Sequence, residues 1–170
     1  MDKNMDNPTG QKDTIAVGCF WGAQAYFKKI PGVLSTRAGY TGGTDTAPDY
    51  EKVCSGKTGH AESVEILFNP AQLPYARLLE HFWRVHNPTS RNKQGSDTGS
   101  QYRASIFYHT EEQKQLALAS KQALEQSGKY NKPIATEIAP ASTFYPAEEY
   151  HQDYLDKNPG GYCHITIKPD

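Results

Sequence analysis

The chain is organised around residues 14–22, which read Thr-Ile-Ala-Val-Gly-Cys-Phe-Trp-Gly. The first four residues of this stretch, apolar or β-branched, have the length and composition of a short buried strand. Residues 23–30 have the composition of a helix that ends at Pro31 and Gly32. Cys19 is therefore expected at a junction between strand and helix, in or near the first helical turn.

A thiol in that position is expected to be reactive. The free N–H groups and the positive end of the helix dipole favour an anion, so Cys19 should ionise below the ordinary thiol pKa of about 8.5. Aromatic neighbours and flanking glycines make the surface beside it apolar and closely approachable. The competing interpretation is that Cys19 is a small buried hydrophobe, the commoner role of a lone cysteine beside aromatic residues.

Length and composition predict a single domain. The chain has 170 residues and a formal net charge of -1, so it is large enough to bury a core and lacks the broad basic field of a nucleic-acid-binding protein. No apolar run approaches the ~18 residues that span a bilayer. Residues 1–12 are predicted to be a flexible arm without a signal peptide, and residues 13–170 a single domain. We expect a cytoplasmic monomer that binds neither nucleic acid nor membrane.

The three cysteines, Cys19, Cys54 and Cys163, are widely spaced and include no C-x-x-C motif. An odd, scattered set argues against a disulfide framework and against a thioredoxin-type motif. A zinc site built from Cys54, His60 and Cys163 is disfavoured because the sequence offers no close pair of ligands. No metal or bound cofactor is predicted.

Hydrophobic periodicity and turn residues predict the remaining elements. Strands are expected at 33–40, 61–68, 104–108 and 136–139, and helices at 74–85, 110–127 and 147–157. Two long polar loops, 41–59 and 87–102, lie between them. The order strand, helix, strand, strand, helix, strand over residues 14–108 is the split βαβ pattern. It predicts a two-layer, ferredoxin-like α+β domain with a mixed sheet, helices on one face, long loops and a coiled C-terminal segment.

One carboxyl group is predicted to lie on an apolar surface. Alternation along residues 61–68 places Glu62 on the same face as Val64, Ile66 and Phe68. A carboxyl on a dry face is pushed toward its neutral form, which makes Glu62 a candidate proton donor near neutral pH. The alternative is that Glu62, near the strand end, turns out to solvent.

Five motifs in one order carry a resemblance to a known family. They are Gly-Cys-Phe-Trp-Gly (18–22), Gly-Tyr-Thr-Gly-Gly (39–43), Thr-Gly-His-Ala-Glu (58–62), Gln-Gly-Ser-Asp with Gly-Ser-Gln-Tyr-Arg (94–97 and 99–103), and Asn-Pro-Gly-Gly-Tyr-Cys (158–163). Together they resemble peptide methionine sulfoxide reductase of the A type, over nearly the whole chain from residue 14 to about residue 165. The resemblance implies reduction of the S epimer of methionine sulfoxide, free or in proteins, to methionine.

The resemblance also implies roles for individual residues. Cys19 would be the nucleophile that attacks the sulfoxide sulfur, and Glu62 the acid that protonates the sulfoxide oxygen. The hydroxyl groups of Tyr50 and Tyr102 would assist Glu62, and Asp97 would orient groups in the same pocket. A sulfoxide oxygen gains negative charge as the sulfur is attacked, so neutral donors at that oxygen suit the chemistry.

A slot for the substrate methyl group is implied by the same resemblance, with Phe20 and Trp21 as its walls. Such a slot contributes only about 1–3 kcal/mol to selectivity, so the polar groups must hold the substrate's orientation.

A second thiol is needed to resolve the sulfenic acid that would form on Cys19. From the residues alone, either Cys163, which follows a flexible glycine segment, or Cys54 could form the disulfide. The resemblance points to Cys163 and gives Cys54 no role. It also implies that thioredoxin, as an external reductant, reduces the Cys19–Cys163 disulfide directly.

Two other classes of function remain open at this point. A cysteine hydrolase or acyltransferase would need a histidine beside Cys19, and His60 is the nearest candidate, with Asp97 as the orienting group. An RNA-recognition module would share the split βαβ order. The weak net charge and the lack of a Lys/Arg-Gly-Phe strand motif count against that module.

Overall fold

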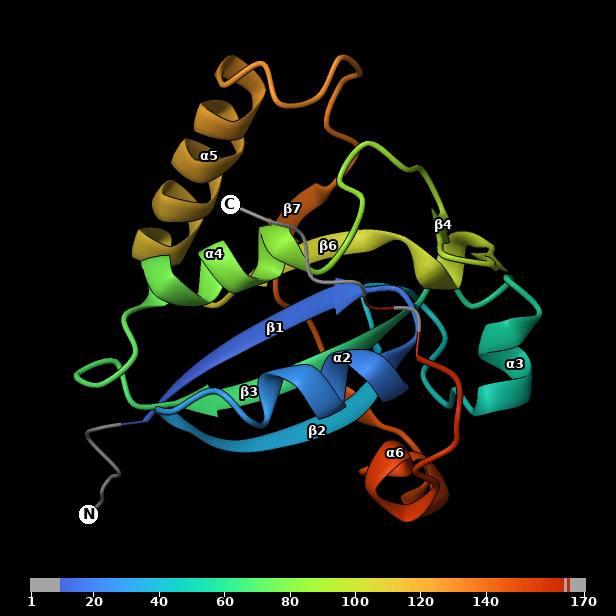
Figure 1. The fold of residues 1–170 in the computed structure, drawn as a ribbon. Coiled ribbons are helices and arrows are strands. Elements are labelled where there is room, and N and C mark those ends of the chain that lie inside the picture. Colours follow the sequence, from blue (N-terminus) through green and yellow to red (C-terminus); the bar gives the residue numbers. More distant parts are fainter. Residues whose placement is uncertain (1–9, 164, 166–170) are drawn as a thin grey trace.

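The computed structural model describes residues 10–163 and 165. Its elements are arranged as a sheet with helices packed against it (Figure 1). The elements in chain order are β1 (Gln11–Val17), α2 (Phe20–Phe27), β2 (Val33–Thr41), α3 (Tyr50–Cys54), β3 (Ala61–Phe68), α4 (Tyr75–Arg84), β4 (Lys93–Gln94), β5 (Asp97–Thr98), the 3-10 helix η1 (Ser100–Tyr102), β6 (Ala104–Tyr108), α5 (Glu111–Gln126), β7 (Glu137–Pro140), β8 (Tyr145–Pro146), the 3-10 helix η2 (Glu149–His151) and α6 (Tyr154–Lys157).

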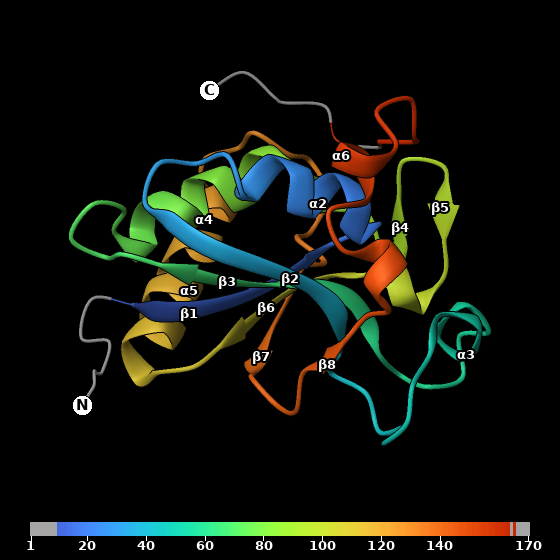
Figure 2. The same cartoon turned by 90° about the horizontal axis from the view of Figure 1, so that it is seen from below.

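Six strands form the main sheet, in the order β7-β6-β1-β3-β2-β8. The β6–β7 pair is parallel and the other four pairs are antiparallel. β1 and β2 therefore flank β3, as a split βαβ unit requires. Helices α2 and α4 lie on one face of this sheet (Figure 2), and α5 contacts α4, β6 and β7. The prediction of an α+β domain with a mixed sheet is confirmed.

The core lies between the sheet and helices α2 and α4. Val64, Ile66 and Phe68 of β3 are fully buried, as their alternation predicts. They belong to the same apolar cluster as Leu78 and Phe82, which lie four residues apart and so on one face of α4. This packing holds β3 rigidly, because core side chains interdigitate at nearly crystalline density.

The turn between β1 and α2 depends on a glycine. Gly18 has a φ of 100°, a conformation that a residue with a Cβ rarely adopts. The chain can therefore leave β1 and begin α2 within two residues, which places Cys19 at the N-cap of the helix. The side chain of Cys19 makes no capping hydrogen bond, so the first N–H groups of the helix remain available to partners from other elements.

Several predicted boundaries differ from the structure. β1 begins at Gln11, inside the range predicted to be an arm, because residues 11 and 12 pair with the end of β3. Residues 1–9 lie outside the described residues. α2 begins at Phe20, three residues before the predicted start. The two predicted loops contain the short helix α3 and the β4–β5 hairpin, which are too short to show periodicity.

The prediction of one helix over residues 147–157 is wrong. The structure has η2 and α6 instead, separated at Asp153, whose φ of 52° is left-handed. The side chain of Gln152 accepts a hydrogen bond from the N–H of Ala38 and donates one to its carbonyl, both at 2.9 Å. This attachment to β2 replaces helical continuation. None of the described helices is long and apolar enough to cross a membrane.

Candidate active site

The predicted site residues come from separate elements. Cys19 is the N-cap of α2, Glu62 is the second residue of β3, and Tyr50 is the first residue of α3. Asp97 belongs to β5 and Tyr102 to η1. Burial raises the pKa of Cys19 and of Tyr102, and the charges of Glu62 and Asp97 raise both values further. The charge of Cys19 also raises the pKa of Tyr102. These groups are therefore electrostatic neighbours.

Glu62 is 1% exposed, so it does not turn out to solvent. Its Oε1 accepts a hydrogen bond from the N–H of Phe20 at 3.2 Å, which ties the carboxyl group to the first turn of α2. Within the described part of the chain, its Oε2 is buried and has no hydrogen-bond partner. Burial, aided by the charge of Asp97 and opposed by the Phe20 N–H, raises the pKa of Glu62 to about 8. The group is mainly a neutral acid at pH 7.

Cys19 is 8% exposed, and both it and Cys163 are free thiols. Burial, followed by the charge of Glu62, raises its pKa above the ordinary thiol range, although the N–H groups of Trp21 and Gly22 act in the opposite direction. The prediction of a lowered pKa is therefore wrong for this structure, because loss of hydration outweighs the helix start. Cys19 and Glu62 are thus electrostatic neighbours, and both are mainly uncharged at pH 7.

Two tyrosines contribute further donors. Tyr50 and Tyr102 are half-buried, and burial, followed by the charge of Glu62, raises the pKa of each hydroxyl group. Both groups therefore stay protonated and can donate hydrogen bonds. The hydroxyl of Tyr50 is also hydrogen-bonded to the thiol of Cys54, which stands at the other end of α3. The site thus presents a thiol, a neutral carboxyl and two phenols.

Phe20 and Trp21, which follow Cys19 in the chain, form an aromatic wall, and residues of the C-terminal segment pack against it. The indole Nε1 of Trp21 donates to Nδ1 of His151 at 2.9 Å, and its ring stacks on Tyr154 with centroids 3.8 Å apart and an interplanar angle of 7°. His151 is 1% exposed, and its ring also packs against the rings of Phe20 and Tyr50, with centroids 5.2 Å and 4.4 Å away. These contacts hold the Trp21 ring in one orientation.

The supporting residues were missed by the sequence reasoning. His151 and Tyr154 belong to η2 and α6, within the range predicted as one helix. Glu148 accepts hydrogen bonds from the hydroxyl of Tyr40 at 2.7 Å and from the N–H of Tyr50 at 2.9 Å. Burial opposes its ionisation, yet these bonds lower its pKa. Only the pairing of distant segments reveals such contacts, so no local sequence signal could have identified them.

Cys163 lies apart from the buried groups. It is exposed and follows Tyr162, whose hydroxyl accepts a hydrogen bond from Ser96 at 3.2 Å. Ser96 immediately precedes Asp97, so this contact joins the C-terminal segment to the loop that carries Asp97. Cys163 is therefore accessible from outside, next in the chain to a residue that contacts the Asp97 loop.

The alternative functions lack support from the described residues. The Nδ1 of His60 accepts the N–H of Gly43 at 3.0 Å, and its Nε2 is 2.7 Å from the carbonyl oxygen of Asp45. Both ring nitrogens are thus occupied by loop backbone, which leaves none to act as a base for Cys19. No group of three or more His, Cys, Asp or Glu side chains among the described residues could hold a metal ion.

The site thus combines a buried thiol, a carboxyl group that is mainly neutral at pH 7, two phenols and an indole held by His151 and Tyr154, which are groups that a thiol-dependent enzyme could use. Residues 11–170 match the family model of peptide methionine sulfoxide reductase. The chain belongs to this family and is an oxidoreductase.

Relatives and solved structures agree with this assignment. The chain is 52% identical over 155 residues to the peptide methionine sulfoxide reductase MsrA of Methanothermobacter thermautotrophicus, covering 91% of this chain and 92% of the relative. The crystal structure of reduced Mxr1 from Saccharomyces cerevisiae is similar, with a TM-score of 0.87, 36% identity and coverage of 96% and 95%. Mxr1 in complex with Trx2 is also similar, with a TM-score of 0.64, 25% identity and coverage of 96% and 94%.

Proposed function

We propose that this protein reduces methionine-S-sulfoxide, free or in proteins, to methionine, with Cys19 as the nucleophile and Glu62 as the proton donor. One observation carries the proposal. Glu62, a buried acid with a pKa of about 8, is held by the N–H of Phe20 at the first turn of the helix whose N-cap is Cys19. This position and the raised pKa support Glu62 as a proton donor for a reaction at Cys19 at neutral pH.

In the reductive step, the sulfur of Cys19 attacks the sulfoxide sulfur while Glu62 donates a proton to the departing oxygen. The hydroxyl groups of Tyr50 and Tyr102 donate hydrogen bonds to that oxygen as its negative charge grows. The S–S bond formed in the attack then breaks as the hydroxyl group passes to the sulfur of Cys19, and the thiol proton of Cys19 returns to the carboxylate of Glu62. The substrate leaves as methionine with two electrons gained, and Cys19, oxidised by two electrons, is left as a sulfenic acid. Both tyrosines retain their protons at neutral pH, which supports this role.

Substrate binding is assigned to the aromatic wall. Phe20 and Trp21 receive the methyl group, and Asp97 orients groups in the same pocket. The hydrogen bond to His151 and the stacking on Tyr154 support the role of Trp21, because a slot lined by a fixed ring needs less ordering when the substrate binds.

The sulfenic acid is resolved by Cys163, which displaces the hydroxyl group as water and forms a disulfide with Cys19. Thioredoxin then reduces this disulfide and leaves with two oxidised cysteines. The exposure of Cys163 and the existence of an Mxr1–Trx2 complex support this step. The proposal includes a cytoplasmic monomer, with a single ferredoxin-like catalytic domain. The strand order β6-β1-β3-β2 supports that description of the domain.

Single-turnover chemistry tests the proposal. Reduced protein mixed with excess methionine-S-sulfoxide, without a reductant, should yield one equivalent of methionine and a Cys19–Cys163 disulfide. Cys19→Ser should form no methionine, whereas Cys163→Ser should form one equivalent and then fail to turn over with thioredoxin. Cys54→Ser is the matched control and should cycle normally. Normal cycling of Cys163→Ser together with failure of Cys54→Ser would assign the resolving role to Cys54 instead.

A further inference from the structure

The two thiols of the proposed disulfide differ in accessibility. Cys19 is 8% exposed, whereas Cys163 is an exposed residue of the C-terminal segment. Thiol–disulfide exchange requires the incoming thiolate to reach the sulfur that it attacks. On the proposed function, therefore, a protein reductant must attack Cys163, and its contact surface must surround that residue.

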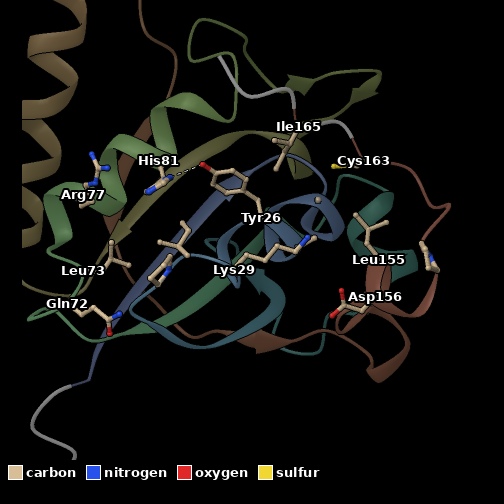
Figure 3. A pocket seen from close by; sticks show the side chains of 15 residues that line it. Tyr26, Lys29, Gln72, Leu73, Arg77, His81, Leu155, Asp156, Cys163 and Ile165 are labelled. Carbon is tan, nitrogen blue, oxygen red and sulfur yellow. Dashed lines mark hydrogen bonds between the residues drawn. The ribbon is translucent and has the colours of Figure 1, made fainter. Parts of the chain in front are cut away.

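A groove of ≈ 960 Å³ lies directly beside Cys163. It runs between α2, the start of α4 and the C-terminal segment. Figure 3 shows Cys163 and Ile165 at one end, Arg77 and Leu73 at the other, and Tyr26 between them. Among the described residues that line it, only Cys163 belongs to the proposed catalytic set, and neither Cys19 nor Glu62 is among them. The groove is thus distinct from the pocket where the sulfoxide would react.

The walls of the groove are mostly apolar and its rim is basic. Apolar side chains from all three segments line it: Tyr26, Ile30, Leu73, Leu155 and Ile165. Lys29 and Arg77 lie exposed at the rim, and Arg77 pairs with the exposed Glu80 of its own helix, a weak interaction at the surface. The rim carboxylate, Asp156, already pairs with Lys28. An apolar floor with excess positive charge suits a protein partner whose contact surface is apolar and bordered by acidic groups.

We propose that this groove is the docking surface for a thioredoxin-class dithiol protein. The apolar surface around the partner's reactive thiol would pack on Tyr26 and Ile165, while acidic side chains meet Lys29 and Arg77. The partner's thiolate attacks the sulfur of Cys163, and the sulfur of Cys19 leaves and takes up a proton. The partner's second thiol then displaces Cys163 as a thiol, which leaves the partner oxidised by two electrons. Substrate and reductant would therefore approach through different surfaces.

Steady-state kinetics of the full chain with thioredoxin and its recycling reductase test the proposal. The double variant Lys29→Glu, Arg77→Glu reverses the rim charge, and Ala25→Phe places a bulky ring in the groove. Each should raise the KM for thioredoxin by about fivefold or more, because complementary charge and fit govern association. The KM for methionine sulfoxide and the rate with dithiothreitol should not change. Lys132→Glu and Ala123→Phe, at exposed sites remote from the groove, are the matched controls.

Two results would overturn the proposal. One is an unchanged KM for thioredoxin in variants that melt like the wild type. The other is a raised KM for a sulfoxide-containing polypeptide, which would assign the groove to the substrate. If the thermal midpoint of the double variant is lower than that of the wild type, the KM for thioredoxin is measured for Lys29→Gln and Ala25→Phe instead. Failure of the wild type to form methionine in a single turnover would instead refute the proposed function.

Discussion

At the scale of single residues, the protonation state of Glu62 controls the proposed chemistry. Burial raises the pKa of Glu62 to about 8, so its acid form persists at neutral pH and is lost as the pH rises through that value. The pKa of Cys19 lies higher still, so its ionisation adds no opposing rise in the same range. We expect the single-turnover rate of methionine formation to fall above about pH 8, which rapid quenching between pH 6.5 and 9.5 would measure.

The variant Glu62→Gln provides the control for that profile. An amide oxygen can still accept the hydrogen bond from Phe20, but the side chain cannot release a proton. The single-turnover rate should fall by about 10²–10⁴-fold and lose its dependence on pH near 8. A variant that keeps the wild-type decline above pH 8 would show that another group titrates there.

At the scale of single elements, β1 contains a buried carboxyl that the proposed reaction does not use. Asp13 is 2% exposed, and its Oδ1 has no hydrogen-bond partner among the described residues. Burial raises its pKa to about 7. Between pH 4 and 7, Asp13 therefore stays protonated in the folded protein but is ionised in the unfolded chain. The free energy of unfolding consequently falls as the pH rises from 4 to 7.

Replacement of Asp13 by Asn should remove this penalty. Relative to the wild type, the free energy of unfolding of Asp13→Asn should increase steadily between pH 4 and 7 and then level off. The final gain should be about 1–4 kcal/mol. Urea unfolding at several pH values measures the difference directly. A difference that stays constant over this range would contradict the raised pKa.

At the scale of the whole molecule, the site is completed by a segment far from it in sequence. Residues 147–157 are attached to β2 at Ala38, and they bring His151 and Tyr154 against Trp21. The side chain of Gln152 attaches this segment to β2 through two hydrogen bonds with the backbone of Ala38. A third hydrogen bond, to the carbonyl of Ala147 at 3.0 Å, lies within the segment. The orientation of Trp21 therefore depends on a contact that is not part of the pocket.

Loss of this attachment should weaken both substrate binding and folding. Gln152→Ala removes hydrogen bonds worth about 0.5–1.5 kcal/mol each, so we expect the KM for methionine sulfoxide to rise about fivefold. The variant also leaves the N–H and carbonyl groups of the buried Ala38 without the Gln152 side chain, so the thermal midpoint should fall by several degrees. Gln122→Ala, at an exposed position on α5, is the control and should leave both quantities unchanged. An unchanged KM in Gln152→Ala would show that other contacts suffice to hold Trp21.

Periodicity and short motifs predicted the positions of Glu62 and Cys19 in the secondary structure. Alternation along β3 predicted that Glu62 shares a face with Val64 and Ile66, because side chains in a strand point to opposite faces in turn. It left open whether Glu62 turns out to solvent, and only the structure shows that it is buried. Gly18 and the residues around it were sufficient to place Cys19 at a helix start. The pKa of Cys19 could not be predicted in this way, because the helix start is local whereas burial depends on every segment packed around the thiol.

The sequence by itself determined the α+β class, the order of the main strands and helices, and the motifs of the reductase family, since these depend on local patterns of residues. Only the tertiary structure decided that the indole of Trp21 rests on His151 and Tyr154, and that an apolar groove adjoins Cys163. The physical reason is distance along the chain. Contacts between segments more than one hundred residues apart arise from the packing of the whole domain, which no local pattern of residues encodes.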